Sequence, residues 1–350
     1  MRRGRWAVAV AVAVALLLGA CGDGEDRPGQ VTSENGGSGS GSGSASGTGS
    51  ASASGTGSAS ASGTGASAGD SSYRPVSDVD SHAAIGTDIA EVKDLMAPAK
   101  EGKAVDWAAV RAVITEGGAS KKSDGSTRTI EKLVDAPGVV AVVLDAVDGK
   151  GASAGASNAV RAQRVDKGIS VLLAAKVRDE LAAAAEKVVA KKIDPAEGAP
   201  HNVDEAWAFF TAGGNGLAAT ADKRAADFKR EGKVREPVIA GLAAAQAAAK
   251  RGDVPTLETA TTEVSEGLDY IFYLATYKYL DNGGDEAERA EGETFYLGIE
   301  PTVKSASPDA DAAIVAAFAS GDAAAGRAAL HQPAVLDALG VEDAERVDRS

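Results

Sequence analysis

The stretch EGLDYIFYLATYKYLDNGGDEAERAEGETFYLGIEP, residues Glu266–Pro301, contains two runs of helical spacing joined by a short glycine turn. Apolar residues recur every three or four positions on both sides of the NGGD segment, as in two amphipathic helices. So short a turn favours antiparallel packing of the two helices. We therefore expect a helical hairpin here and a fold built from helices around it.

The region after residue 77 continues this helical pattern. Alanine is abundant, proline is sparse, and runs of alternating β-branched residues are nearly absent. The apolar run Gly138–Leu144 resembles a strand, but one isolated strand cannot make a sheet, so we interpret it as a helix or a buried segment. We predict an all-α helical bundle with these helices: Asp88–Lys100, Asp106–Glu116, Ala156–Lys192, Asp204–Phe210, Leu217–Phe228, Glu236–Arg251, Thr256–Leu280, Asp285–Lys304 and Asp309–Ala319.

Two segments of the chain resemble each other at an offset of 150 residues. Ile89–Gly117 and Ile239–Gly267 share eight identical positions, and both contain an Ala-Lys-x-Gly turn between two helical runs. Alanine and glycine are so frequent in this chain that chance accounts for part of the match. We interpret the unit as a helical hairpin used twice, in two related bundle-like halves, 77–200 and 201–350.

The N-terminal residues have the features of a bacterial lipoprotein. Three arginines precede a short apolar run, which ends at the lipobox-like Leu18-Gly19-Ala20-Cys21. We therefore expect residues 1–20 to be a signal peptide and Cys21 to be lipidated, so that the chain is extracytoplasmic and anchored to the outer face of the cell membrane. The alternative is an ordinary signal peptide with a chance cysteine.

Residues 21–76 are dominated by Gly, Ser, Ala and Thr and cannot form a core, so we predict a disordered tether before a helical domain at 77–350. Removal of three arginines with the signal peptide leaves 33 basic and 50 acidic residues, a net charge of −17. An acidic surface disfavours nucleic acid and anionic lipid as partners. The lipid anchor is therefore the membrane contact that we expect.

Five of the six tyrosines lie within Glu266–Pro301, together with several carboxylates. Antiparallel packing of the two helices would place carboxylates opposite phenols, and both supply the anionic oxygen that suits ferric iron, Fe³⁺. The alternative is that the tyrosines are core aromatics whose hydroxyls bond to the glutamates. The candidate metal ligands are Glu266, Asp269, Tyr270, Tyr273, Glu293, Tyr296 and Glu300.

A second candidate site lies at the start of another predicted helix. His201, Asp204 and Glu205 share its first turns, a spacing that is compatible with metal binding, and His201 and Glu205 are further candidate ligands. The alternative is a helix N-terminus with acidic residues near the positive end of its dipole. His82 and His331 have no such neighbours in the sequence.

Enzyme signatures are weak. The sequence GASAG, at Gly65–Gly69 and Gly151–Gly155, matches the pattern GxSxG, but a nucleophile elbow requires a strand–turn–helix unit within an α/β sheet. No HExxH sequence, P-loop or dinucleotide-binding fingerprint is present. We therefore expect a protein without catalytic activity.

Four segments of the helical region share the pattern of a known family: Gln163–Gly168, His201–Phe210, Ala221–Arg224, and Ala290–Tyr296 with Pro301. Together they resemble the low-iron-inducible periplasmic, or Fe-assimilating, proteins, a family first named from green algae that has bacterial members. The resemblance implies a secreted or surface iron-assimilation protein without known catalysis. The chain is also similar in concept to imelysin-like iron-uptake lipoproteins, although Asp204 stands where their HxxE motif has glutamate.

The clustered acids and tyrosines and the family resemblance together predict a lipid-anchored, iron-binding protein that assists iron acquisition. Its expected partners are a metal ion and a membrane permease. A different class of function is a structural or interaction lipoprotein that docks on a membrane or cell-wall partner and has no metal affinity. An extracytoplasmic enzyme is a third class, which the missing signatures disfavour.

Overall fold

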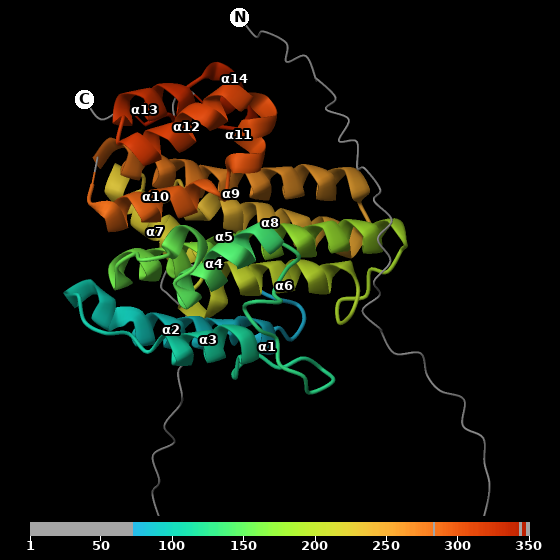
Figure 1. Ribbon diagram of the computed structural model, residues 1–350. Helices are drawn as coiled ribbons and strands as arrows, with labels where there is room; N and C mark the ends of the chain where they lie inside the picture. The colour runs from blue at the N-terminus through green and yellow to red at the C-terminus, as the bar shows by residue number, and fades with distance from the viewer. Residues whose placement is uncertain (1–72, 283, 343–344, 348–350) are drawn as a thin grey trace, which may run out of the picture. The chain divides into compact units, whose positions relative to one another are not determined.

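The computed structural model describes residues 73–282, 284–342 and 345–347 of the 350-residue chain. The predicted signal peptide, Cys21 and nearly all of the predicted tether lie outside these residues. Within the described part the fold is all-α, as predicted (Figure 1), and the sole β feature there is an isolated bridge between Lys121 and Thr127. No helix in the same part is long and apolar enough to cross a membrane.

Most of the predicted helices overlap observed ones, and the structure adds short helices that the sequence pattern did not indicate. The predicted helix Asp88–Lys100 is divided between α2 and η1. The apolar run that resembled a strand is a helix, α4. The elements are α1 (Asp80–Ala83), α2 (Ile85–Met96), η1 (Ala97–Glu101), α3 (Trp107–Glu116), α4 (Pro137–Asp148), η2 (Gly151–Ser153), α5 (Asn158–Val189), α6 (Ala199–Thr211), η3 (Ala212–Gly214), α7 (Leu217–Phe228), α8 (Arg235–Arg251), α9 (Val254–Asn282), α10 (Glu286–Tyr296), α11 (Glu300–Ala306), α12 (Pro308–Ser320), α13 (Ala323–Leu330) and α14 (Pro333–Ala338).

The predicted helix Asp285–Lys304 is wrong as a single element, because the structure divides it into α10 and α11. Pro301 lies in the first turn of α11, where its missing N–H needs no partner, so a new helix begins there. Gly298, in the connection, lies against the ring of Phe272, and a Cβ atom at this glycine would be 2.6 Å from the ring. The bend therefore lets the chain pass close over α9.

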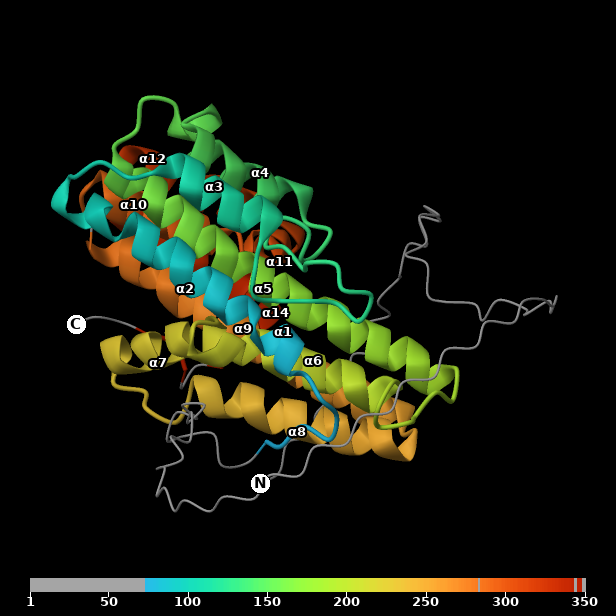
Figure 2. The same cartoon turned by 90° about the horizontal axis from the view of Figure 1, so that it is seen from below.

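Helix α5 is the element around which the others pack, and it contacts α4, α6, α9 and α10 (Figures 1 and 2). The Ser157 side chain caps its N-terminus by accepting a hydrogen bond from the Val160 N–H at 3.3 Å. Each fully buried Leu, Ile or Val on α5 stabilises the fold by about 1.5–3 kcal/mol. These buried apolar residues include Val165, Ile169, Leu172, Leu173, Val177 and Leu181.

Helices α8 and α9 pack so closely that glycine is required at two positions. A Cβ atom at Gly241 would lie 2.8 Å from Val264, and one at Gly267 would lie 2.7 Å from Val238. Side chains larger than hydrogen would separate the helices, and this explains why both positions are glycine. The tight pair fixes the direction of α9, which carries most of the tyrosines.

The two units of the proposed repeat share a turn but differ in the length of the helix after it. Gly102 and Gly252 have nearly equal positive φ angles, 68° and 65°. Gly117 ends α3, whereas Gly267 lies inside α9, which continues to Asn282. The shared turn is therefore a common backbone feature of two unequal hairpins, and the division of the chain into two related halves stays a prediction.

The first described residues belong to the packed domain. Tyr73, which composition placed in the tether, is buried and stacks on Trp207 of α6 with ring centroids 5.4 Å apart. The chain then enters α1, which contacts both α2 and α6 (Figure 2). This N-terminal segment brings residues near position 80 onto the same surface as the start of α6.

Candidate functional site

The predicted tyrosine stripe is present on α9, but it faces the C-terminal segment rather than α10. The rings of Tyr270 and Tyr273 stack with centroids 6.0 Å apart. The Tyr270 hydroxyl donates to the Glu345 carbonyl oxygen at 3.0 Å, and the Tyr273 hydroxyl lies 3.0 Å from His331 Nε2 and accepts from the Val347 N–H at 3.2 Å. Burial raises the pKa of Tyr270 to about 12, which disfavours a phenolate.

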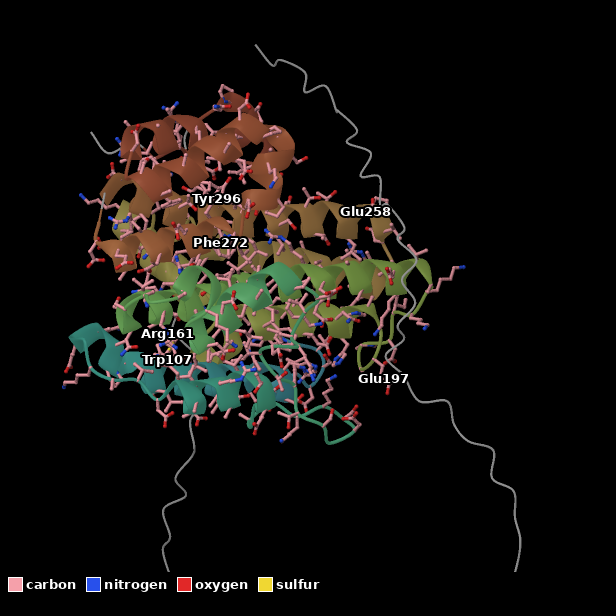
Figure 3. All side chains as sticks on the ribbon, viewed as in Figure 1. Trp107, Arg161, Glu197, Glu258, Phe272 and Tyr296 are labelled. Carbon is pink, nitrogen blue, oxygen red and sulfur yellow. The ribbon has the colours of Figure 1, made fainter. Side chains whose placement is uncertain are left out.

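The predicted carboxylate ligands are also separated from one another. Glu266 is partly buried beside Gly340. Tyr296, visible in the upper part of Figure 3, donates to Asp311 Oδ1 at 2.9 Å. Three predicted carboxylates each pair with a different cation, and these pairs are Asp269 with Arg178 at 2.7 Å, Glu293 with Arg164 at 3.2 Å, and Glu300 with Lys304 at 3.7 Å.

The structure therefore does not bring the seven predicted ligands on α9–α11 into one group. Carboxylates of α9 and α10 turn towards α5, because its arginines compensate their charge there. One phenol–carboxylate contact spans α9 and α10, a hydrogen bond between Tyr279 and Glu291. Burial, the charge of Glu291 and this hydrogen bond raise the pKa of Tyr279 above its usual value. Neither residue was a predicted ligand.

Two histidines that are far apart in the sequence meet on one carboxylate where α1 lies against α6. His82 Nε2 lies 2.8 Å from Glu205 Oε1, and His201 Nε2 lies 3.1 Å from the same oxygen. The two imidazole rings are nearly perpendicular, with centroids 5.9 Å apart. The exposed fraction is 12% for the His82 side chain, 21% for His201 and 13% for Glu205, so solvent reaches the cluster.

Helix α5 adds a second carboxylate to this cluster. Asn202 Nδ2 donates to Glu180 Oε2 at 2.6 Å and more weakly to Glu205 Oε2 at 3.3 Å, and Lys176 Nζ lies 2.8 Å from Glu180 Oε1. Burial, and then the charge of Glu205, raise the pKa of Glu180 to about 7. Burial also acts to raise the pKa of Glu205, but hydrogen bonds from His201, His82 and Glu180 lower it far below its usual value. Of the two carboxyl groups, Glu205 is therefore the stronger acid and Glu180 the weaker one.

The orientation of His201 is set by a serine and a buried aspartate. The Ser77 hydroxyl donates to Asp204 Oδ2 at 2.7 Å, so its oxygen accepts from His201 Nδ1 at 2.8 Å. The hydrogen bond to Glu205 raises the pKa of His201. Asp204 is fully buried, and its other donors are Tyr73 Oη at 2.7 Å, Gln246 Nε2 at 2.6 Å, and the N–H groups of Val76 and Ser77, both at 2.8 Å.

Two of the segments that carry the family resemblance face each other across α5 and α10. Lys167 Nζ lies 3.1 Å from Glu291 Oε1, and Arg164 pairs with Glu293. The second pair lies at the edge of a cavity of about 160 Å³. In these two ion pairs, each charged side chain of α5 has an oppositely charged partner on α10. The pairs therefore explain these polar residues as contacts between packed helices.

Sequence reasoning placed His201 and Glu205 together but missed His82, Glu180 and Ser77. The missed residues lie on other elements, and no local spacing relates them to α6. The rarity of histidine is the one signal in the sequence, because the chain has three histidines and two of them meet here.

In this cluster, contacts of hydrogen-bond length join both imidazoles to one carboxylate oxygen. Among the described residues, no group of three or more His, Cys, Asp or Glu side chains is already arranged to hold a metal ion. The N···O separations of 2.8 and 3.1 Å are nevertheless close to the separation of two atoms bound to one ion, about 3.0–3.4 Å for bonds of about 2.1 Å.

Comparison with known proteins gives no information on function, so the functional proposal rests on the geometry of the site. No family model, no curated protein and no solved structure matches the chain.

Proposed function

We propose that this protein captures a transition-metal ion, with iron as the metal to test first, through His82, His201, Glu205 and Glu180. The observation that supports the proposal is the convergence of two imidazole Nε2 atoms on a single carboxylate oxygen. Imidazole and carboxylate together suit divalent ions of the first transition series, including Fe²⁺ and Zn²⁺. Glu180, which shares the Asn202 amide with Glu205, would be the fourth donor.

The hydrogen bonds around His201 are those that a metal-binding histidine requires. A ligating imidazole normally donates its second N–H to an oxygen, which fixes the tautomer and the ring orientation. Ser77 and Asp204 provide such a partner for Nδ1, which leaves Nε2 facing Glu205. On the other ring, His82 Nδ1 lies 3.4 Å from the Ser81 hydroxyl.

This proposal moves the predicted iron site away from the tyrosines. A phenolate ligand for Fe³⁺ requires deprotonation, and the hydroxyls of Tyr270 and Tyr273 are already engaged with carbonyl, amide and imidazole groups. The nitrogen-containing cluster favours the ferrous ion instead. The same proposal includes a role in iron acquisition, which the family resemblance supports, with a membrane permease as the expected partner. The N-terminal sequence features support a position at the outer face of a membrane.

Metal titration of the full chain with Cys21→Ser tests the site, because the substitution removes the one thiol that would compete for metal. We expect one equivalent of Fe²⁺ to bind under anaerobic conditions, with Zn²⁺ and Co²⁺ as comparisons. His201→Ala and Glu205→Gln should weaken binding by more than about 100-fold, beyond the effect of losing an outer partner. Tyr296→Phe serves as the control and should bind like the parent chain.

Two results would contradict this assignment. Equal affinity in the His201→Ala chain would exclude the cluster as the metal site. A tyrosinate charge-transfer band on addition of Fe³⁺ to the Glu205→Gln chain would place the iron at the tyrosines instead.

A structural or interaction lipoprotein is the second candidate function, and one observation favours it. The tyrosines and acids of α9 and α10 form packed contacts with satisfied hydroxyls, as expected for a helix interface without a ligand. This candidate predicts that no metal binds with measurable affinity and that crosslinking recovers a protein partner.

A further inference from the structure

The cavity beside the ion pair of Arg164 and Glu293 lies where α4, η2, α5 and α10 meet. Its volume is about 160 Å³. A cavity of about 150 Å³ is large enough to hold benzene, so this one can hold a ligand of about six non-hydrogen atoms. The lining combines apolar and polar side chains, which include Val142, Asp145, Ser153, Arg164, Glu293 and Leu297.

One carboxylate of this lining has no partner in the fold. Asp145 is partly buried on α4, and within the described residues its carboxylate has neither a cation nor a hydrogen-bond donor. Asp148, one turn further along the same helix, has two cations, with Arg111 at 3.1 Å and Lys150 at 3.0 Å. A carboxylate that is partly withdrawn from water is stabilised by a cationic partner. Asp145 therefore has the capacity to bind a cation from outside the chain.

The guanidinium of Arg164 is not available to Asp145, because its charge is used elsewhere. Its Nη1 group donates to the Ala152 carbonyl oxygen and to Ser153 Oγ at 3.1 Å, and its Nη2 group pairs with Glu293 Oε2 at 3.2 Å. Arg164 and Glu293 therefore balance each other. The charge that remains on the lining is the single negative charge of Asp145.

The backbone of η2 leaves room for the Asp145 carboxylate. A Cβ atom at Gly151 would collide with Asp145 Oδ2, and the φ angle of Gly151 is +51°, in the region that favours glycine. Glycine at this position therefore allows the carboxylate to lie against η2, at the wall of the cavity.

The lining also limits the kind of cation that fits. Val142 and Leu297 supply apolar surface, which suits a ligand with an aliphatic body. Among the described residues that line the cavity, none is aromatic, whereas quaternary ammonium groups are recognised by aromatic rings. A primary ammonium group instead has three N–H donors, as a lysine side chain has, and carboxylate and hydroxyl oxygens accept from such donors.

From this cavity we infer a binding site for a small primary amine. The ammonium group pairs with Asp145, and the aliphatic body contacts Val142 and Leu297. Glu293 and Ser153 offer further oxygen acceptors at the same wall. This site is separate from the cluster on α6, and the inference does not depend on metal binding.

A titration of the full chain with Cys21→Ser tests the inference, using three ligands of matched size. Butylammonium is the probe, butanol is its neutral counterpart and butyrate is its anionic counterpart. Amide chemical shifts of the isotope-labelled chain report binding at about pH 7. Butylammonium should bind with a Kd on the order of 1 mM, about tenfold or more below the Kd of either counterpart. The shifts should concentrate in α4, η2 and α10.

Two matched substitutions on α4 assign the binding to one carboxylate. Asp145→Asn should weaken butylammonium binding by about tenfold or more, and it should fold normally because Asp145 has no protein partner to lose. Asp148→Asn removes a carboxylate one turn away that has its own cations, so it should bind like the parent chain. Circular dichroism confirms that each variant is folded.

Three results would overturn the inference. Equal affinity for butylammonium and butanol would show that the cavity does not recognise the ammonium group. Tighter binding of butyrate would make Arg164 the recognising group and the ligand an anion. An unchanged butylammonium affinity in folded Asp145→Asn would place the ligand elsewhere. None of these results bears on the metal titration, so the two proposals fail separately.

Discussion

The tyrosine region on α9 and the histidine cluster at α6 show two ways in which polar residues are used. On α9, neighbouring positions of one helix supply Tyr270 and Tyr273, and each hydroxyl has its own partner in the C-terminal segment. At α6, His82 and His201 come from distant parts of the sequence and share a single oxygen of Glu205. The tyrosines, which are close together in the sequence, have separate partners. The two histidines, which are far apart in the sequence, contact the same carboxylate oxygen.

The difference follows from helix geometry. Residues three or four positions apart on a helix point in the same general direction but remain separated along the axis, so each meets a different part of the covering chain. A common centre instead requires side chains from separate elements that point towards one another. The cluster meets this requirement because α1, α5 and α6 each contribute to it.

The largest expected difference between the regions concerns two buried aspartates. Asp204→Ala should lower the free energy of unfolding by about 3–5 kcal/mol, because it leaves several buried donors without an acceptor. Asp311→Ala is the matched variant in the tyrosine region, where Tyr296 and Lys304 are the partners, and should cost about 1–2 kcal/mol. Urea denaturation measures the free energy of unfolding of both variants. Equal decreases would show that the two regions do not differ in this respect.

Metal-linked stability gives the next largest effect. A divalent ion at a free concentration about 100 times its Kd should raise the free energy of unfolding by about 2.7 kcal/mol. His82→Ala should abolish the gain, whereas His331→Ala, a histidine beside Tyr273, should keep it. Thermal melting with and without Zn²⁺ measures this, and a gain that survives in His82→Ala would argue against the cluster.

The pH dependence of stability tests the carboxylates of α9. Burial raises the pKa of Asp269 to about 6 despite Arg178, so the folded protein retains a proton that the unfolded chain releases near pH 4. The contribution of Asp269 to stability is therefore present at low pH and is lost as the pH rises through about 6.

Asp269→Asn should remove this pH dependence. The fall in unfolding free energy between about pH 4 and about pH 7 should become smaller by about 2 kcal/mol, as measured by denaturation at several pH values. An identical pH profile would show that Arg178 fully compensates the buried charge.

The smallest predicted effect is that of a single hydroxyl. Tyr273→Phe removes the partner of the Val347 N–H and of His331 and should cost about 1 kcal/mol, with no change in metal affinity. Chemical denaturation and metal titration of the same variant check the two statements. If Tyr273→Phe lost metal binding, the tyrosine region would have to be part of the metal site.

Much of the fold was predictable because helices leave local signals. Helix α7 has the predicted bounds, and α3 begins beside Asp106, whose side chain caps it by accepting from the Ala109 N–H at 3.0 Å. The break before Pro301 was missed because the apolar pattern continues across it and a close contact with Phe272 decides the bend.

The site was predictable in part. His201 and Glu205 are one helical turn apart, so their proximity follows from spacing alone. The contributions of His82 and Glu180 depend on how α1 and α5 pack against α6, and no pattern in a single segment encodes that packing. The phenols and acids of α9 are close together in the sequence, but their side chains contact different parts of the fold.

The segment before α1 also connects the site mechanically to the preceding chain. Asp204 holds Tyr73, Val76 and Ser77 by hydrogen bonds, and Ser77 contacts His201. Tension applied to the chain ahead of Tyr73 is borne by these bonds before it reaches the helical core. The same pull that would extract this segment therefore acts directly on the orientation of an imidazole in the cluster.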